Sequence, residues 1–108
     1  MSEFIIDRFT GPAGHTRIAS GQPFEVEVVV EDDDLEGGPC PVSLSVQPKA
    51  CSVSPRSVLV DVPVGDAQGH ATATLVLTGP AGTACRLFAT LPNGQQRRLR
   101  LMIGEAPA

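Results

Sequence analysis

Large aromatic side chains are scarce in this 108-residue sequence, which contains no tryptophan, no tyrosine and four phenylalanines. A hydrophobic core must therefore be built from valine, leucine, isoleucine and alanine. Such residues suit the thin interior between two β-sheets. Sugar-binding proteins usually present exposed tryptophan or tyrosine, so the absence of both disfavours a lectin-like role.

Long apolar runs and export signals are also missing. No stretch approaches the roughly 18 consecutive apolar residues of a membrane-spanning helix, so no membrane span is expected. The N-terminus, MSEFIIDRF, lacks the basic region followed by an apolar region that marks a secretory signal. We therefore expect synthesis in the cytoplasm, with Met1-Ser2 as a natural start. An excised part of a secreted protein is the alternative, and the localisation stays open.

An excess of positive charge and recognisable catalytic motifs are also missing. The net charge of −4 disfavours nucleic acid as a partner, because phosphate contact needs a basic surface. Neither histidine, His15 or His70, lies at a spacing that suggests a nucleophile–base pair. Phosphate-binding loops, dinucleotide fingerprints and paired catalytic carboxylates are absent too. The sequence thus predicts no enzyme activity, no catalytic residue and no cofactor.

What the sequence does contain is apolar alternation with period two, clearest between Gly65 and Gly94. Alanine or leucine occupies positions 71, 73, 75 and 77, and a Gly/Pro turn follows at 79–82. A second alternation then places Cys85, Leu87, Ala89 and Leu91 on one face. Such alternation between turn residues predicts half-buried antiparallel β-strands.

The same pattern predicts seven or eight strands and no helix of useful length. They cover 3–9, 16–19, 23–31, 41–48, 57–64, 70–78, 84–91 and 96–103. Pro63 cannot donate a ladder hydrogen bond, so the strand at 57–64 is expected at a sheet edge. In the first strand Phe4 and Ile6 compete with Ile5 and Phe9 for the core, and that register stays open.

Short strands with a turn about every 8–12 residues are typical of an all-β, immunoglobulin-like β-sandwich with Greek-key order. We expect one sheet to contain the strands at 3–9, 23–31 and 70–78. The other sheet is expected to contain those at 41–48, 84–91 and 96–103, and an up-and-down barrel is the alternative architecture. Residues 1–108 are expected to form a single domain, with 104–108 as a flexible tail.

The segment from Gly69 to Thr90 carries a recognisable motif. Gly69-His70-Ala71-Thr72-Ala73-Thr74-Leu75 is followed by the turn Ala81-Gly82-Thr83 and by Ala89-Thr90 at the end of the next strand. In these residues the chain resembles the bacterial immunoglobulin-like (Big-like) modules of the invasin and intimin group. Similar modules occur as accessory parts of phage virion proteins. The resemblance implies an immunoglobulin-like sandwich with a non-catalytic role.

The sequence departs from that family at several points. Cys85 stands where the family usually places an aromatic residue, and neither a tandem repeat nor an export signal is present. The disulfide cysteine and the tryptophan of antibody-type domains are missing as well. A small structural accessory subunit, of the virion decoration, tail or injection-machine type, fits these departures better than an adhesin stalk. An extracellular adhesion or carbohydrate-contact module from a larger surface protein is the alternative.

Three cysteines accompany the predicted strands. In the expected topology Cys51 follows the strand at 41–48 and Cys85 begins its antiparallel neighbour, so these two could form a disulfide. Cys40 lies at the opposite end of the same strand. Three reduced thiols are the alternative, which the missing export signal favours. Without a Cys-x-x-Cys pair or a nearby pair of histidines, a zinc site is not expected.

An acidic run separates the strands at 23–31 and 41–48. Its weak candidates for a Ca²⁺ site are Asp32, Asp33, Asp34 and Glu36, because carboxylates are hard oxygen ligands. The spacing does not match an EF-hand loop. A solvated loop is the simpler interpretation, so no metal is expected, and Ca²⁺-dependent binding is a third functional option.

The alternation also predicts a mixed patch on the outer face of the second sheet. Positions 86 and 88 alternate with core positions, so they face outward beside positions 98, 100 and 102 of the last strand. The residues are Arg86, Phe88, Arg98, Arg100 and Met102. Aromatic, methionine and arginine side chains together are the composition of an interface core. We expect these residues to bind a protein partner, and a second copy docked by its acidic loop is one possibility.

Overall fold

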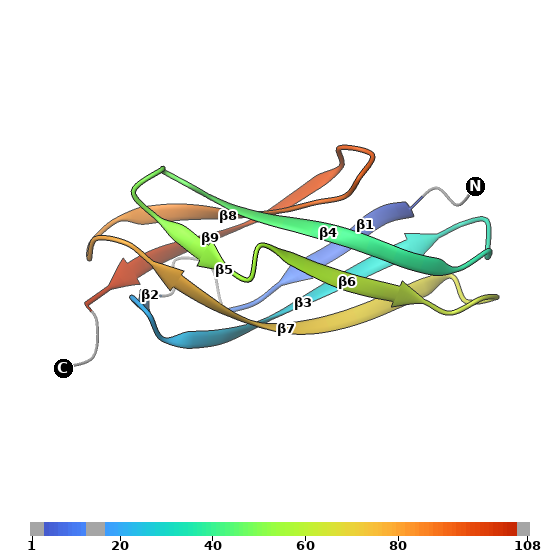
Figure 1. The fold of residues 1–108 in the computed structure, drawn as a ribbon, viewed down its shortest axis with the longest axis horizontal. Coiled ribbons are helices and arrows are strands. Elements are labelled where there is room, and N and C mark those ends of the chain that lie inside the picture. The colour runs from blue at the N-terminus through green and yellow to red at the C-terminus, as the bar shows by residue number, and fades with distance from the viewer. Residues whose placement is uncertain (1–3, 13–16, 106–108) are drawn as a thin grey trace.

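The computed structural model describes residues 4–12 and 17–105. These residues form nine β-strands and no helix (Figure 1). The strands are β1 (Phe4–Thr10), β2 (Arg17–Ala19), β3 (Pro23–Asp32), β4 (Gly38–Gln47), β5 (Ser52–Ser54), β6 (Ser57–Val62), β7 (Gln68–Thr78), β8 (Ala84–Thr90) and β9 (Gln96–Gly104). The described ranges accordingly contain no helix of the length and apolarity that a membrane crossing needs. The expected all-β class is confirmed.

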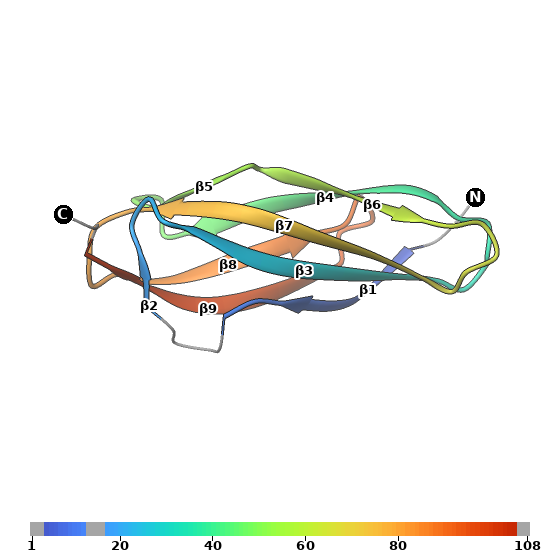
Figure 2. The ribbon, with the colours of Figure 1, turned by 90° about the horizontal axis from the view of Figure 1, so that it is seen from below.

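The strands pair into two sheets, with the orders β1-β3-β7-β5 and β2-β9-β8-β4-β6. All pairings are antiparallel except that of β2 with β9, which is parallel. The expected division of the strands between two sheets is confirmed, and the single closed sheet of a barrel is not found. Both sheets run along the long axis of a molecule that measures 47 × 21 × 20 Å (Figure 2).

One hydrophobic core lies between the sheets, and most of its side chains are aliphatic, with Phe9, Phe24 and the three cysteines among them. The fully buried aliphatic side chains include Val28 and Val30 of β3, Val42 of β4, Val60 of β6, Leu75 and Leu77 of β7, and Leu87 and Ala89 of β8. Most of them alternate along their strands with a more exposed residue, as the period-two pattern predicts, although Val29, between Val28 and Val30, is also fully buried. This alternation decides which side chains are left on the outer faces, and so it positions the candidate site.

The register of β1 is settled by a β-bulge. Ile6 pairs with Val30 and Arg8 with Val29, so the ladder skips Asp7. An extra residue reverses the alternation beyond it. Ile6 and Phe9 are therefore both buried although three positions separate them. A strict two-residue period could not place both of them in the core, which is why the sequence pattern left this strand open.

Several strand limits differ from the expected ones. β4 begins at Gly38 rather than at 41, so Cys40 is fully buried within it. β5 was not predicted, because three residues are too short to show a period. β6 ends at Val62 rather than at 64, so Val64 lies beyond the strand and is 82% exposed. Gly104, expected in a tail, is the last residue of β9. The prediction that β6 is an edge strand is confirmed.

A close approach between the sheets lies beside Gly69 of β7. A Cβ atom at this position would lie 2.8 Å from the carbonyl oxygen of Asp61 and 2.9 Å from the Cα of Val62, both on β6. Real Cβ atoms essentially never lie this close to such atoms. The absence of a side chain at Gly69 therefore lets β6 and β7, which belong to different sheets, come together along this side of the molecule.

Candidate functional site

The five residues expected to bind a partner lie together on the outer face of the five-stranded sheet. Strand register arranges them in rows across β4, β8 and β9. One row is Gln47, Arg86 and Arg100, and the next is Ser45, Phe88 and Arg98. Met102 follows one row further along, opposite Ala84. We call the surface formed by Arg86, Phe88, Arg98, Arg100 and Met102 the arginine face.

Exposure within the arginine face differs by residue type. Its three arginines are exposed, whereas Phe88 and Met102 are half-buried. An apolar centre framed by guanidinium groups is thus present, as the sequence indicated. Arg17 of β2 lies opposite Met102 and adds a further exposed cation, which sequence reasoning missed. The strand itself is expected at 16–19, but nothing in the sequence indicates its parallel pairing with β9, which brings Arg17 beside Met102.

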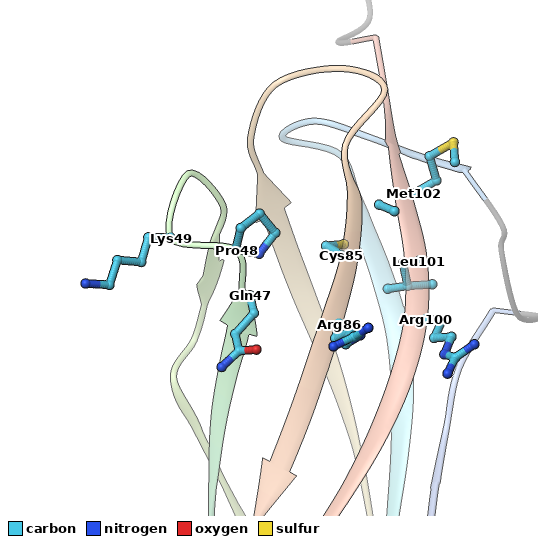
Figure 3. A pocket seen from close by; sticks show the side chains of 9 residues that line it. Gln47, Pro48, Lys49, Cys85, Arg86, Arg100, Leu101 and Met102 are labelled. Atoms are coloured by element: carbon cyan, nitrogen blue, oxygen red, sulfur yellow. The ribbon is translucent and has the colours of Figure 1, made fainter.

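A pocket of about 560 Å³ opens at one end of the arginine face (Figure 3). We call it the end pocket. It is lined by Gln47, Pro48 and Lys49 from the end of β4 and the following loop, by Ala84, Cys85 and Arg86 of β8, and by Arg100, Leu101 and Met102 of β9. Three of these side chains are cationic and none is acidic. The lining therefore combines positive charge with apolar surface.

The two arginines of the end pocket face each other without an anionic partner. Arg86 and Arg100 are directly opposite across the antiparallel pair β8–β9. Within residues 4–12 and 17–105 neither guanidinium makes a hydrogen bond or an ion pair. Like charges opposite one another across a strand pair are destabilising. An anion bound between them would remove that repulsion, so the pair favours an acidic ligand.

Arg97, by contrast, is an arginine of β9 that has a hydrogen-bond partner. It lies one position from Arg98 and faces the other way, where its Nε donates to the carbonyl oxygen of Ile6 at 3.4 Å. That hydrogen bond links β9 to β1 of the other sheet. Arg97 therefore has a structural partner, whereas the arginines of the arginine face point away from the core.

The acidic run forms the loop between β3 and β4, and one carboxylate organises it. Asp32 is fully buried. Its two oxygens accept hydrogen bonds from the backbone N–H groups of Asp34, at 3.2 Å, and Gly37, at 2.8 Å. We call residues 33–37 the acidic loop. Both oxygens of Asp32, one of the weak metal-ligand candidates, are thus turned onto the backbone of the loop.

The remaining metal candidates, Asp33, Asp34 and Glu36, are exposed. Across the described residues no group of three His, Cys, Asp or Glu side chains is arranged to hold a metal ion. A shallow depression of about 430 Å³ lies beside the loop and is lined by Glu31, Asp33, Asp66, Ala67 and Gln68. Asp66, from the β6–β7 connection, was not anticipated in this acidic surface.

All three cysteines are free and buried in the structure. Burial raises the pKa of the Cys40, Cys51 and Cys85 thiols, and the nearby charge of Cys51 raises that of Cys85 further, against a backbone hydrogen bond with Leu101. Such thiols stay protonated near neutral pH and are poor nucleophiles. The Cys51–Cys85 disulfide is not formed here and stays a prediction.

The histidines add no second site. His70 is exposed on the outer face of the four-stranded sheet, opposite Val29. His15 lies outside the described residues. Among the described residues, the candidates for a functional role are therefore the positive surface at one end of the molecule and the negative surface at the other.

Comparison with known proteins shows the fold of the chain. No protein-family model matches the sequence, and no curated protein matches it. Among solved structures, a β-glucosidase from Listeria innocua matches with a TM-score of 0.67 and 15% identity, over 99% of this chain and 17% of that one. Domains 4 and 5 of the S-layer protein SbsC match with a TM-score of 0.55 and 13% identity, over 94% of this chain and 54% of that one. This chain thus spans a part of each longer chain, and at these identities the likeness is one of all-β fold alone.

Proposed function

We propose that this chain is a non-catalytic, immunoglobulin-like module that binds another protein through the arginine face. The Greek-key assignment is supported by the strand orders, in which β3 pairs with β7 and β4 with β8. Structures of the same fold occur within longer chains, namely an S-layer protein and a glycosidase. A fold that recurs in this way fits a module whose role is contact rather than chemistry.

The observation that carries the proposal is the composition and order of the arginine face. Interface cores are enriched in aromatic, methionine and arginine side chains, and binding energy concentrates where such residues meet. Here they occupy adjacent rows of one sheet. The partner is a protein with an acidic surface, because Arg86 and Arg100 have no anion of their own among the described residues.

We place the module among small structural accessory subunits, of the kind that decorate virions or complete tail and injection machines. The second candidate is an extracellular adhesion module, and the likeness to S-layer domains is the observation that favours it. Both candidates use the same face. They differ in the partner, which for the first is a virion or assembly protein and for the second is a cell-surface component.

Site-specific photo-crosslinking tests the proposal. A photoreactive amino acid in place of Ser45 lies beside Phe88 at the edge of the arginine face, and one in place of Thr72 lies on the outer face of the other sheet. In extracts of the cells that encode the chain, we expect a discrete adduct from position 45 and none from position 72. Phe88→Asp should remove that adduct. Equal labelling from both faces, or an adduct unaffected by Phe88→Asp, would overturn the proposal.

A further inference from the structure

The long axis of the molecule separates two regions of opposite charge. β4 begins at Gly38, directly after the acidic loop, and ends at Gln47, which lines the end pocket. Its ten residues, at about 3.3 Å per residue, place the two regions roughly 30 Å apart. Exposed carboxylates gather at the first end and unpaired cations at the second. The molecule is therefore a rod with an acidic end and a basic end.

The acidic end also carries an exposed apolar side chain. Leu35, in the middle of the acidic loop, is 46% exposed and has a φ of 58°. A left-handed backbone is unusual for a bulky residue and costs free energy. Leu35 is nevertheless held firmly, since its N–H donates to the carbonyl of Asp32 and its own carbonyl accepts from the N–H of Gly65 at 2.9 Å. The loop thus presents a leucine flanked by carboxylates.

The basic end has the complementary arrangement. In the end pocket the apolar surfaces of Pro48, Ala84 and Met102 lie among the cations Lys49, Arg86 and Arg100. An apolar side chain flanked by acids is the ligand that such a lining fits, because the side chain is removed from water while the carboxylates pair with the guanidinium groups.

We infer that the acidic loop of one copy docks into the end pocket of a second copy, with Leu35 in the pocket and Asp34 against Arg86 and Arg100. The inference rests on the proposed protein-binding role of the arginine face and names its partner. The contact is head to tail, so each copy keeps one free loop and one free pocket. Repetition of the same contact builds an open chain of modules along the long axis.

A symmetric dimer through the arginine face is disfavoured by the same charges. A two-fold contact would bring Arg86, Arg98 and Arg100 of both copies together, with no acidic residue lining the end pocket to offset them. The head-to-tail contact instead pairs opposite charges. It is accordingly weakened by salt, which screens exposed charges over a Debye length of about 10 Å at 0.1 M and about 3 Å at 1 M.

Two variants, each lacking one half of the contact, test the inference. Arg86→Glu with Arg100→Glu removes the basic pocket and keeps the loop. Leu35→Gly with Asp34→Asn removes the leucine and one carboxylate and keeps the pocket, and glycine suits the positive φ. Analytical ultracentrifugation at high protein concentration, low salt and with reductant measures the mass. Circular dichroism confirms that both variants are folded.

For the unmodified chain we expect a mass that rises with concentration and falls with salt. Each variant alone should stay monomeric, and an equimolar mixture of the two should form a heterodimer and nothing larger. A monomeric unmodified chain, unimpaired variants, or a mixture that stays monomeric would each overturn the inference. If position 45 still crosslinks to a different protein in that case, the proposed function stands without the self-association.

Discussion

Arg86 and Arg100 lie directly opposite one another on β8 and β9, with no hydrogen-bond or ion-pair partner within the described residues. Two like charges in this position reduce stability in the absence of a ligand. The arrangement is explained if the pair is maintained for binding an anion rather than for folding.

Replacing one member of the pair should therefore stabilise the unbound protein. For Arg100→Glu we expect the free energy of unfolding to rise by roughly 0.5–1 kcal/mol in low salt, since a like-charge cross-strand pair becomes an opposite-charge pair. Urea denaturation measures it, and the gain should vanish in high salt. The control is Arg56→Glu, an exposed arginine between β5 and β6, which should change stability little. A loss of stability in Arg100→Glu would contradict the unpaired geometry.

An aspartate introduced on the outer face of β8 should leave the protein folded, whereas an aspartate on the inner face should not. Phe88→Asp lies on the half-buried outer face and should leave the protein folded, at a cost of about 1 kcal/mol, while abolishing partner binding. Leu87→Asp places a charge in the core, where Leu87 is fully buried, and should prevent folding. Thermal melting followed by circular dichroism distinguishes them. If Phe88→Asp unfolds, the assignment of the arginine face to the surface is wrong.

The carboxylate of Asp32 should be essential to the acidic loop. Asp32→Ala removes the charged acceptor of two hydrogen bonds, from the N–H groups of Asp34 and Gly37, and hydrogen bonds to a charged group contribute about 1.5–3 kcal/mol. We expect that loss in chemical denaturation, together with faster hydrogen exchange at residues 34 and 37. Asp33→Ala, in which an exposed carboxylate is removed, is the matched control and should be close to neutral. Equal effects of the two substitutions would show that Asp32 does not organise the loop.

A side chain at Gly69 should destabilise the protein, whereas a side chain at Gly104, also a strand glycine, should be tolerated. Gly69→Ala brings a Cβ to 2.8 Å from the Asp61 carbonyl oxygen, and we expect a loss of about 1–3 kcal/mol from overpacking. Gly104→Ala is the control, because the nearest atoms lie 3.7 Å or more from its Cβ. The difference between their urea midpoints measures the closeness of β6 and β7. Comparable stability of both variants would be inconsistent with that approach.

The buried thiols should make stability fall at alkaline pH. Burial raises the pKa of Cys40, Cys51 and Cys85 above the ordinary value of 9.0, so above that pH the unfolded chain loses protons that the folded chain keeps. Their stabilising effect is complete below pH 9 and is lost above it, with a limiting slope of about 1.4 kcal/mol per pH unit for each thiol. Replacing Cys85 with alanine should reduce the slope, which denaturation across this pH range measures. An unchanged slope would contradict the raised pKa.

Much of the fold could be read from alternation alone, because a strand buried on one face must repeat every two residues. The limits of β3, β8 and β9 were predicted to within one residue. The pattern failed where the period is broken or too short to detect, as at the bulge in β1 and in the three-residue strand β5.

For the candidate site, the sequence alone determined the sides: which residues of β8 and β9 point out of the core, and where the carboxylates are concentrated. Tertiary structure alone decided the neighbours. It placed Arg86 opposite Arg100, brought Arg17 beside Met102, turned Asp32 inward, and set the acidic loop and the end pocket at opposite ends of one rod. Whether a side chain points into or out of the core is a local property of its strand. Which side chains become neighbours depends on the register between strands that are far apart in sequence, and only the packing of the whole core selects that register.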